Sequence, residues 1–168
     1  MKFRFVCLAL SALAAFGSAQ SEMRYRDMVF AKSQVEKDVV YKRAKAWDGK
    51  EIDLKLDLYA PEGDTKKDRP AIVFVHGGYL AIGSKDGGWE GQFAEKFARR
   101  GFVTISINYR LRPDPNPTFN DAMMDAMTDT MDAFLWLRSR AARYGVDPKK
   151  IALAGYSAGG EIITNLCY

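Results

Sequence analysis

The sequence predicts an α/β fold in which an N-terminal antiparallel hairpin precedes a mostly parallel sheet. Three short apolar runs, at residues 71–75, 103–107 and 151–154, lack the polar alternation of a half-exposed strand. Such runs are typical of parallel strands that are covered on both faces. Helical patterns separate the runs, so strand and helix alternate along the chain as they do in successive βαβ units.

The first nineteen residues have the pattern of a cleaved export signal. Lys2 and Arg4 precede an apolar run at residues 5–16, and residues 17–19 supply the small side chains that a signal peptidase recognises. The apolar run is too short to span a bilayer comfortably. We therefore expect cleavage after Ala19 and a secreted or periplasmic protein that has no membrane association after cleavage.

Charge and cysteine content argue against a nucleic-acid partner and against an internal disulfide. Cleavage would remove Lys2 and Arg4 and lower the formal charge from +4 to +2. No basic patch interleaved with aromatic residues stands out, so no nucleic-acid partner is expected. Cys167 would then be the only cysteine, and this chain cannot form an internal disulfide. We expect no cofactor and no bound metal.

Residues 20–34 are predicted to form a polar arm over a domain that extends from residue 35 to residue 168. Residues 51–59 alternate strictly between polar and apolar side chains, which predicts a half-buried strand. The segment Val35–Lys45 precedes this strand, and the residues Trp47–Lys50 between them predict a hairpin turn. The alternation places Asp53 and Asp57 on the outer, solvated face of the second strand.

Two helices are expected between the apolar runs. The first should end before Gly101, and its pattern is an aromatic residue at every fourth position, namely Trp89, Phe93 and Phe97. The second should extend from Asn120 to Tyr144 and end at Gly145. Its predicted inner face consists of Met123, Met127, Met131, Phe134 and Leu135. A solvated face is expected to hold Asp121, Asp125 and Asp129.

The last apolar run leads into Gly-x-Ser-x-Gly at residues 155–159, and residues 161–166 have a helical pattern. A serine on a sharp turn from strand to helix has strained backbone geometry, so its neighbours must be small, as Gly155 and Gly159 are. The fold would place Ser157 at the carboxyl end of a central strand, where α/β sheets hold their sites. Ser157 is therefore the candidate nucleophile, with the Ala158 N–H group directed at a developing oxyanion.

A second candidate motif follows the apolar run at residues 71–75. Its residues are His76, Gly77, Gly78 and Tyr79. Adjacent glycines after a strand allow backbone N–H groups to face a ligand, which is the geometry that an oxyanion hole requires. The two motifs together are more specific than either alone, because both sit at the ends of predicted parallel strands.

With these motifs in this order, the chain resembles α/β-hydrolase carboxylesterases of the hormone-sensitive-lipase-like group and the related secreted esterases. The resemblance covers the chain from about residue 35 to its end. The residues that carry it are His76–Gly78, Ile107–Leu111, Tyr144–Pro148 and Gly155–Gly160. It implies an α/β-hydrolase fold and a small-molecule ester as the substrate.

By this resemblance, Ser157 would attack an ester carbonyl, and the oxyanion would be stabilised by the N–H groups of Gly77, Gly78, Tyr79 and Ala158. Structural roles would fall to His76, Gly155 and Gly159. The esterases usually have a third glycine where Tyr79 stands, and kynurenine-formamidase-like hydrolases have a similar His-Gly-Gly-Tyr, so the preference between ester and amide is open. Glu161 could line the pocket, but we expect a carboxylate that stabilises the start of its helix.

The acid and the base of a catalytic triad are missing from this chain. In this fold the order is serine, then acid, then histidine, but residues 158–168 contain neither histidine nor aspartate. The only histidine is His76, which in the resembling families shapes the oxyanion loop. We therefore expect the N-terminal portion of a longer secreted esterase, truncated after the helix that follows Ser157 and inactive by itself. The alternatives are a non-catalytic binding module with the hydrolase fold, and an amidase or peptidase on the same scaffold.

Overall fold

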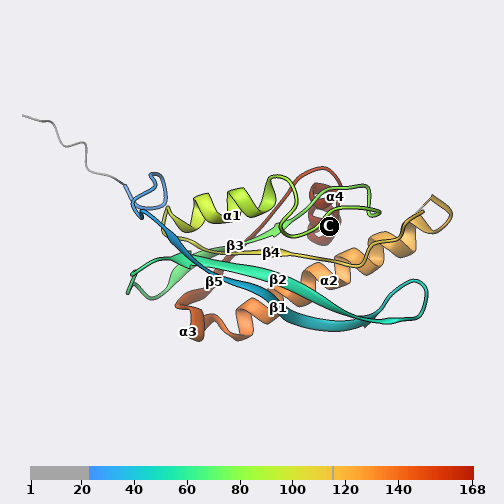
Figure 1. Ribbon diagram of the computed structural model, residues 1–168, viewed down its shortest axis with the longest axis horizontal. Helices are drawn as coiled ribbons and strands as arrows, with labels where there is room; N and C mark the ends of the chain where they lie inside the picture. The colour runs from blue at the N-terminus through green and yellow to red at the C-terminus, as the bar shows by residue number, and fades with distance from the viewer. Residues whose placement is uncertain (1–22, 115) are drawn as a thin grey trace, which may run out of the picture.

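The computed structural model describes residues 23–114 and 116–168, so the predicted signal peptide at residues 1–19 lies outside the described residues. One mixed sheet of five strands, in the order β1-β2-β4-β3-β5, forms the centre of the fold (Figure 1). The strands are β1 (Ser33–Lys45), β2 (Glu51–Pro61), β3 (Arg69–Val75), β4 (Val103–Ile107) and β5 (Val146–Gly155). The α-helices are α1 (Glu90–Ala98), α2 (Phe119–Ser139), α3 (Ala141–Tyr144) and α4 (Ala158–Cys167). A short 3-10 helix, η1 (Asn116–Thr118), precedes α2.

The predicted hairpin is confirmed. Strands β1 and β2 pair antiparallel up to the Lys45–Glu51 pair next to the turn, and β2 continues the sheet by pairing antiparallel with β4. The β1–β2 register shifts between Glu36 and Val39, where Asp38 has a φ of 56°. This shift is a β-bulge, which turns one residue out of the ladder and re-aims its side chain.

The parallel part of the sheet is also confirmed, but the place of its last strand is not the predicted one. Strand β3 pairs in parallel with β4 on one side and with β5 on the other. Among the described residues, β5 is therefore an edge strand, not a central one. Its apolar residues Ile151 and Leu153 are only half-buried. An apolar run fixes the tendency of a strand to be covered, but it does not specify which elements cover it.

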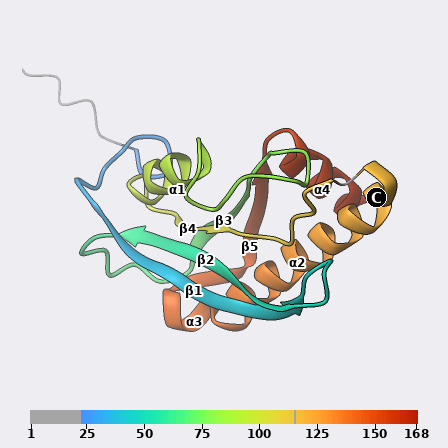
Figure 2. The same ribbon diagram turned by 45° about the vertical axis from the view of Figure 1, so that its right-hand side comes forward.

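Helices cover both faces of the sheet. Figures 1 and 2 show α1 on the opposite side of the sheet from α2 and α3. Helices α2 and α4 share a large apolar core with the α2 side of the sheet, whose central members include Leu56, Val73 and Ile105. A smaller cluster under α1 contains Phe74 and Ala94. The arrangement is that of an open α/β sheet with layers on both faces.

The second predicted helix differs from expectation in its end and in its buried face. It ends at Ser139, and the separate turn α3 follows before Gly145, whose φ of 62° terminates the helical segment. The buried residues of the helix are Ala122, Met123, Ala126, Asp129, Thr130, Ala133, Trp136 and Leu137. Met131 and Leu135 are exposed. Alanines allow a helix to approach a sheet closely, so of the predicted methionines only Met123 is fully part of the contact.

Two carboxylates that were predicted to face solvent are completely buried. Asp57 lies 2.8 Å from the Nζ atom of Lys85, and Asp129 lies 2.7 Å from the Nζ atom of Lys42 and 2.8 Å from the Nε atom of Arg110. Local periodicity missed both carboxylates because their partners are distant in the sequence. A buried charge requires such a partner to offset the loss of its hydration.

The described part of the predicted arm, residues 23–34, runs past the end of α1 into β1. The Tyr25 N–H group donates to the Arg100 carbonyl at 2.8 Å, and the Phe30 N–H group donates to the Arg99 carbonyl at 3.0 Å. Arg24 forms an ion pair with Asp64. In the part of the chain that the structure describes, no helix combines the length and the apolar character needed to cross a bilayer.

Candidate active site

Ser157 occupies the turn between β5 and α4. Its backbone has a φ of 53° and a ψ of −126°, an unfavourable region for a residue with a side chain. The residue is exposed, and its side chain makes no hydrogen bond to any group in residues 23–114 and 116–168. Such strain persists only where the surrounding structure enforces it. At this turn the surrounding segments come close because two of the neighbouring residues are glycines.

Gly155 and Gly159 allow the strand and the helix to meet around Ser157. A Cβ atom added at Gly155 would lie 2.5 Å from the carbonyl carbon of Gly159, and one added at Gly159 would lie 2.1 Å from the carbonyl oxygen of Val75. Both positions therefore exclude any side chain. Gly160 is different, because a Cβ atom there would make only an ordinary contact of 3.5 Å.

The segment after β3 lies directly against this turn. A Cβ atom on Gly77 would lie 3.0 Å from the Tyr156 carbonyl oxygen, so the two backbones are in contact. Gly78, Tyr79 and Leu80 all have positive φ values, of 118°, 56° and 60°. The segment thus reverses direction sharply beside Ser157. The structure brings together the two motifs that the sequence placed far apart.

The N–H groups at this junction have no acceptor among the described residues. None of the protein hydrogen bonds there is donated by the main chain of Gly77, Gly78, Tyr79 or Ala158. Glu161 and Gly159, which follow in α4, do bond back to the Ser157 and Tyr156 carbonyls at 3.0 Å each. Unpaired donors beside a strained serine are chemically equipped to bind an anionic oxygen.

His76 is buried at the start of the same segment and makes no hydrogen bond to Ser157 in the described part of the chain. Its ring stacks on Tyr109 with centroids 4.3 Å apart, and its Nδ1 atom lies 2.7 Å from the Gly77 carbonyl oxygen. A carbonyl only accepts, so Nδ1 carries the proton. The other nitrogen, Nε2, is buried without a partner in the described part of the chain. Burial lowers the pKa of His76, so its ring is neutral at pH 7.

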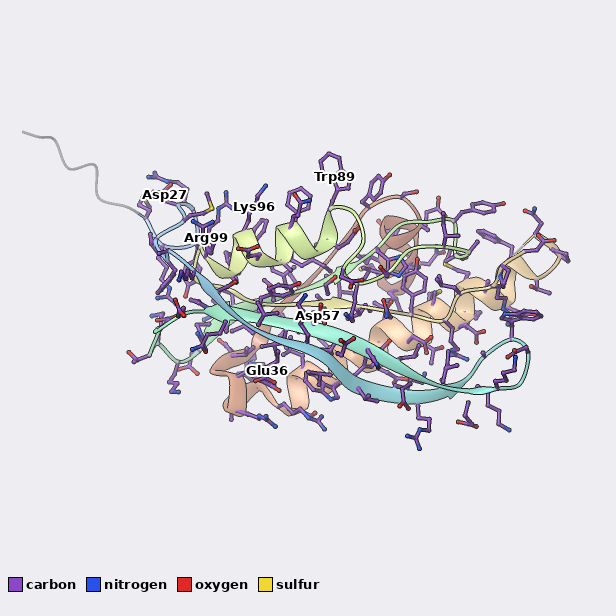
Figure 3. The ribbon with its side chains drawn as sticks, in the orientation of Figure 1. Asp27, Glu36, Asp57, Trp89, Lys96 and Arg99 are labelled. Atoms are coloured by element: carbon purple, nitrogen blue, oxygen red, sulfur yellow. The ribbon has the colours of Figure 1, made fainter. Side chains whose placement is uncertain are left out.

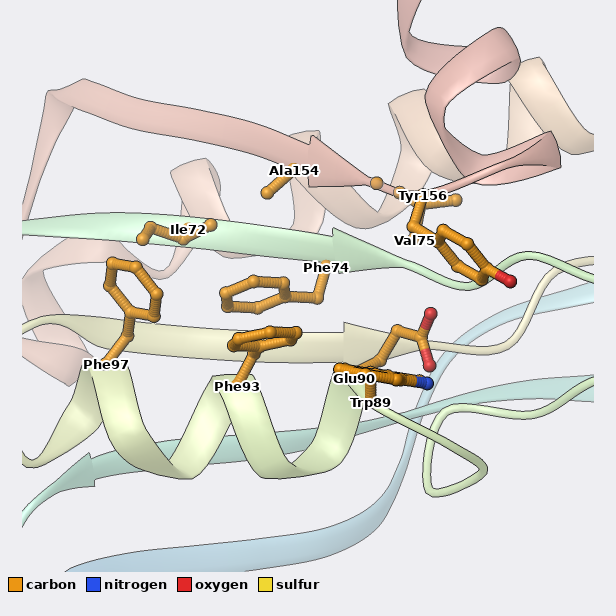
Figure 4. A pocket seen from close by; sticks show the side chains of 10 residues that line it. Ile72, Phe74, Val75, Trp89, Glu90, Phe93, Phe97, Ala154 and Tyr156 are labelled. Carbon is orange, nitrogen blue, oxygen red and sulfur yellow. The ribbon is translucent and has the colours of Figure 1, made fainter.

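A cavity of about 430 Å³ opens next to Tyr156, on the α1 side of the sheet (Figure 4). Its walls are mostly apolar, and they come from Ile72, Phe74, Val75, Trp89, Glu90, Phe93, Phe97, Ala154, Gly155 and Tyr156. Trp89 and Phe93, two of the aromatic residues whose spacing predicted helix α1, are both exposed. The residues that α1 buries are Glu90, Ala94 and Ala98.

Glu161 lies exposed in the first turn of α4, as expected for a carboxylate that stabilises a helix start, and it does not line the cavity. Among the residues that the structure describes, no group of three or more His, Cys, Asp or Glu side chains is arranged to bind a metal ion.

Comparison with known proteins shows which family the chain resembles. Residues 56–166 match the model of the BD-FAE family. The chain is 33% identical over 79% of its length to the probable isoprenylcysteine alpha-carbonyl methylesterase ICME of Oryza sativa subsp. japonica. It is 39% identical over 67% of its length to the phenmedipham hydrolase of Pseudarthrobacter oxydans. These matches cover only 28% and 22% of those two proteins.

A solved structure is similar over most of the chain. Thermogutta terrifontis esterase 2, in a form phosphorylated by paraoxon, superimposes with a TM-score of 0.61 and 36% sequence identity. The match covers 77% of this chain and 45% of that esterase. The chain thus spans less than half the length of the solved esterase and about a quarter of the length of the two curated relatives.

Proposed function

The chain belongs to the BD-FAE family of the α/β-hydrolase esterase group, and we propose that it carries the nucleophile and the oxyanion-binding groups of a serine carboxylesterase. The substrate class is a small-molecule ester. One observation carries the proposal: the strained turn of Ser157 is in backbone contact with the glycine segment after β3, and N–H groups of both segments have no acceptor among the described residues. The esterase names of the relatives support it.

In the proposed reaction each of these groups has a role. The Ser157 oxygen attacks the ester carbonyl carbon while its proton passes to a base, and the carbonyl oxygen becomes an oxyanion. The N–H groups of Gly77, Gly78, Tyr79 and Ala158 stabilise that oxyanion. The bond to the alcohol oxygen then breaks, and the alcohol leaves with a proton. Water hydrolyses the acyl-serine, which releases the acid and restores the hydroxyl.

The base is the part that these residues do not supply. His76, the only histidine of the chain, is buried and has no hydrogen bond to Ser157 within the described residues. We propose that the histidine and its carboxylate come from outside these 168 residues. The chain by itself should then acylate Ser157 slowly, because a neutral hydroxyl is a weak nucleophile.

An external base tests this proposal. We expect imidazole, added to the 168-residue chain with p-nitrophenyl butyrate, to produce a release of p-nitrophenol above the rate of imidazole alone. The Ser157→Ala variant should lose this excess completely. Ser139→Ala, which removes an exposed hydroxyl at the end of α2, should retain it. An excess rate that survives in Ser157→Ala, or no excess with the unmodified chain, would contradict the assignment of the nucleophile.

A further inference from the structure

The loop from His76 to Lys85 ends in a buried charge. The Lys85 side chain is 5% exposed, and its Nζ atom lies 2.8 Å from Asp57 Oδ1 and 3.3 Å from Asp38 Oδ1. Asp57 lies in the middle of β2, as Figure 3 shows, and its side chain is fully buried. Asp38 is the residue at the bulge of β1, and its N–H group also donates to Asp57 Oδ1, at 2.9 Å.

Stability alone does not account for this cluster. Replacing a buried ion pair by apolar residues of similar volume is often neutral or stabilising, because burial removes both charges from water. The Oδ2 atom of Asp57 is moreover buried without a hydrogen-bond partner in the described part of the chain. Burial acts to lower the pKa of Lys85, but the hydrogen bond and the charge of Asp57 raise it above its usual value. The ammonium group is therefore charged at neutral pH.

The backbone of Lys85 is fixed as firmly as its side chain. Its N–H group donates to the Asn108 side-chain oxygen at 2.7 Å, and its carbonyl accepts from the Ser106 hydroxyl at 2.6 Å. Ser106 pairs with Asp57 across β2 and β4. Of these two paired residues, Asp57 contacts the side chain of Lys85 and Ser106 contacts its main chain. The end of the loop is thus attached to three strands.

The loop between His76 and Lys85 has little room to adjust. A Cβ atom on Gly83 would lie 2.5 Å from the His76 ring, and one on Gly78 would lie 2.0 Å from the Ile82 carbonyl oxygen. The Ile82 N–H group bonds back to the Gly78 carbonyl at 3.0 Å. At the start of the loop, the Tyr109 hydroxyl donates to the His76 carbonyl at 2.9 Å. A displacement of Lys85 is therefore transmitted to Gly78 and His76.

We propose that Lys85 is a positioning residue, whose ion pair with Asp57 holds the loop so that the N–H groups of Gly77, Gly78 and Tyr79 stay directed at the oxyanion beside Ser157. The inference rests on the function proposed above for these N–H groups. Lys85 acts through the loop and does not touch the substrate. Neither the family match nor the names of the relatives assigns a role to this pair.

The test replaces Lys85 by methionine, which retains the length of the side chain and removes its charge. The matched control is Lys42→Met. Lys42 also bonds two carboxylates, Asp129 at 2.7 Å and Asp132 at 2.6 Å, but both of these partners belong to α2 and neither is a residue of the loop. Two quantities are measured on the 168-residue chain. One is amide hydrogen exchange in peptides that cover residues 76–85. The other is the rate of Ser157 phosphorylation by diethyl p-nitrophenyl phosphate with imidazole present.

We expect Lys85→Met to accelerate exchange in the loop at least about tenfold and to slow phosphorylation about 10- to 100-fold, because loss of one oxyanion donor costs about 100-fold or more. Lys42→Met should change both quantities less than about twofold. The double variant Lys85→Met/Asp57→Leu removes both charges and should recover thermal stability, while phosphorylation remains slow. This variant separates positioning from stability and also serves if Lys85→Met alone fails to fold.

The inference is overturned if exchange in the loop is unchanged, or if phosphorylation recovers together with stability in the double variant. Its failure is distinguishable from failure of the proposed function. If Ser157 of the unmodified chain does not react at all, the proposed function is wrong, and the exchange measurement still decides whether Lys85 orders the loop.

Discussion

The close approach of α4 to the end of β3 makes Gly159→Ala a sharp test of the candidate site's backbone geometry. The added Cβ atom would lie 2.1 Å from the Val75 carbonyl oxygen, 2.8 Å from its carbonyl carbon and 2.9 Å from the His76 carbonyl oxygen. These are backbone atoms, so no rotamer change relieves the contact. An ordinary contact of 3.4 Å requires α4 to move by about 1.3 Å. Overpacking of this kind costs about 1–3 kcal/mol.

Gly160→Ala provides the matched control one residue away. Its Cβ atom would meet nothing closer than 3.5 Å, and alanine in place of glycine inside a helix is favourable by up to about 1 kcal/mol. The two variants should therefore differ by about 1–4 kcal/mol in the free energy of unfolding. For a chain of this size that is a difference of about 2–16 °C in melting temperature. Equal melting temperatures would refute the close approach of α4 to β3.

Two further predictions concern buried titratable side chains, those of His76 and Asp129. Because burial lowers the pKa of His76 from its usual 6.5, the unfolded chain takes up a proton first as the pH falls. The stability that the neutral His76 ring contributes above pH 6.5 should decrease as the pH falls below 6.5, by at most about 1.4 kcal/mol per pH unit. His76→Gln should flatten the melting temperature between pH 8 and pH 5, and an unchanged slope would show that another group titrates. Asp129→Asn leaves Lys42 and Arg110 with a neutral partner and should lower the free energy of unfolding, measured with urea, by about 3 kcal/mol. The control Asp53→Asn, at a surface ion pair, should lower it by less than about 1 kcal/mol.

Patterns that act over a few residues were sufficient for the elements and for the two motifs. The alternation at residues 51–59 predicted β2, and the apolar runs predicted β3, β4 and β5. Steric requirements beside a strained serine identified Gly155 and Gly159. The contact that excludes a side chain is local at Gly155, whereas at Gly159 it is made by the Val75 carbonyl of β3. The contact between the loop after β3 and the Ser157 turn followed from the parallel pairing of the strands that carry them.

Properties that depend on distant partners were not predictable in the same way. Asp57 looked like a solvated residue because alternation ignores Lys85, which reaches it from a loop 28 positions later in the sequence. Asp129 became a buried carboxylate because Lys42 and Arg110 converge on it from β1 and from the segment after β4. The edge position of β5 among the described residues likewise depends on which strands are available to pair, and its apolar sequence does not contain that information.

The central claim is that Ser157 is the nucleophile, and peptide mapping after reaction with diethyl p-nitrophenyl phosphate and imidazole tests it most directly. The reaction forms a bond between phosphorus and the serine oxygen and releases p-nitrophenol, so the adduct can be located by its mass. We predict one diethylphosphoryl group per chain, on Ser157, and none in the Ser157→Ala variant. An adduct on another residue, or an unmodified Ser157 after prolonged reaction, would contradict the claim.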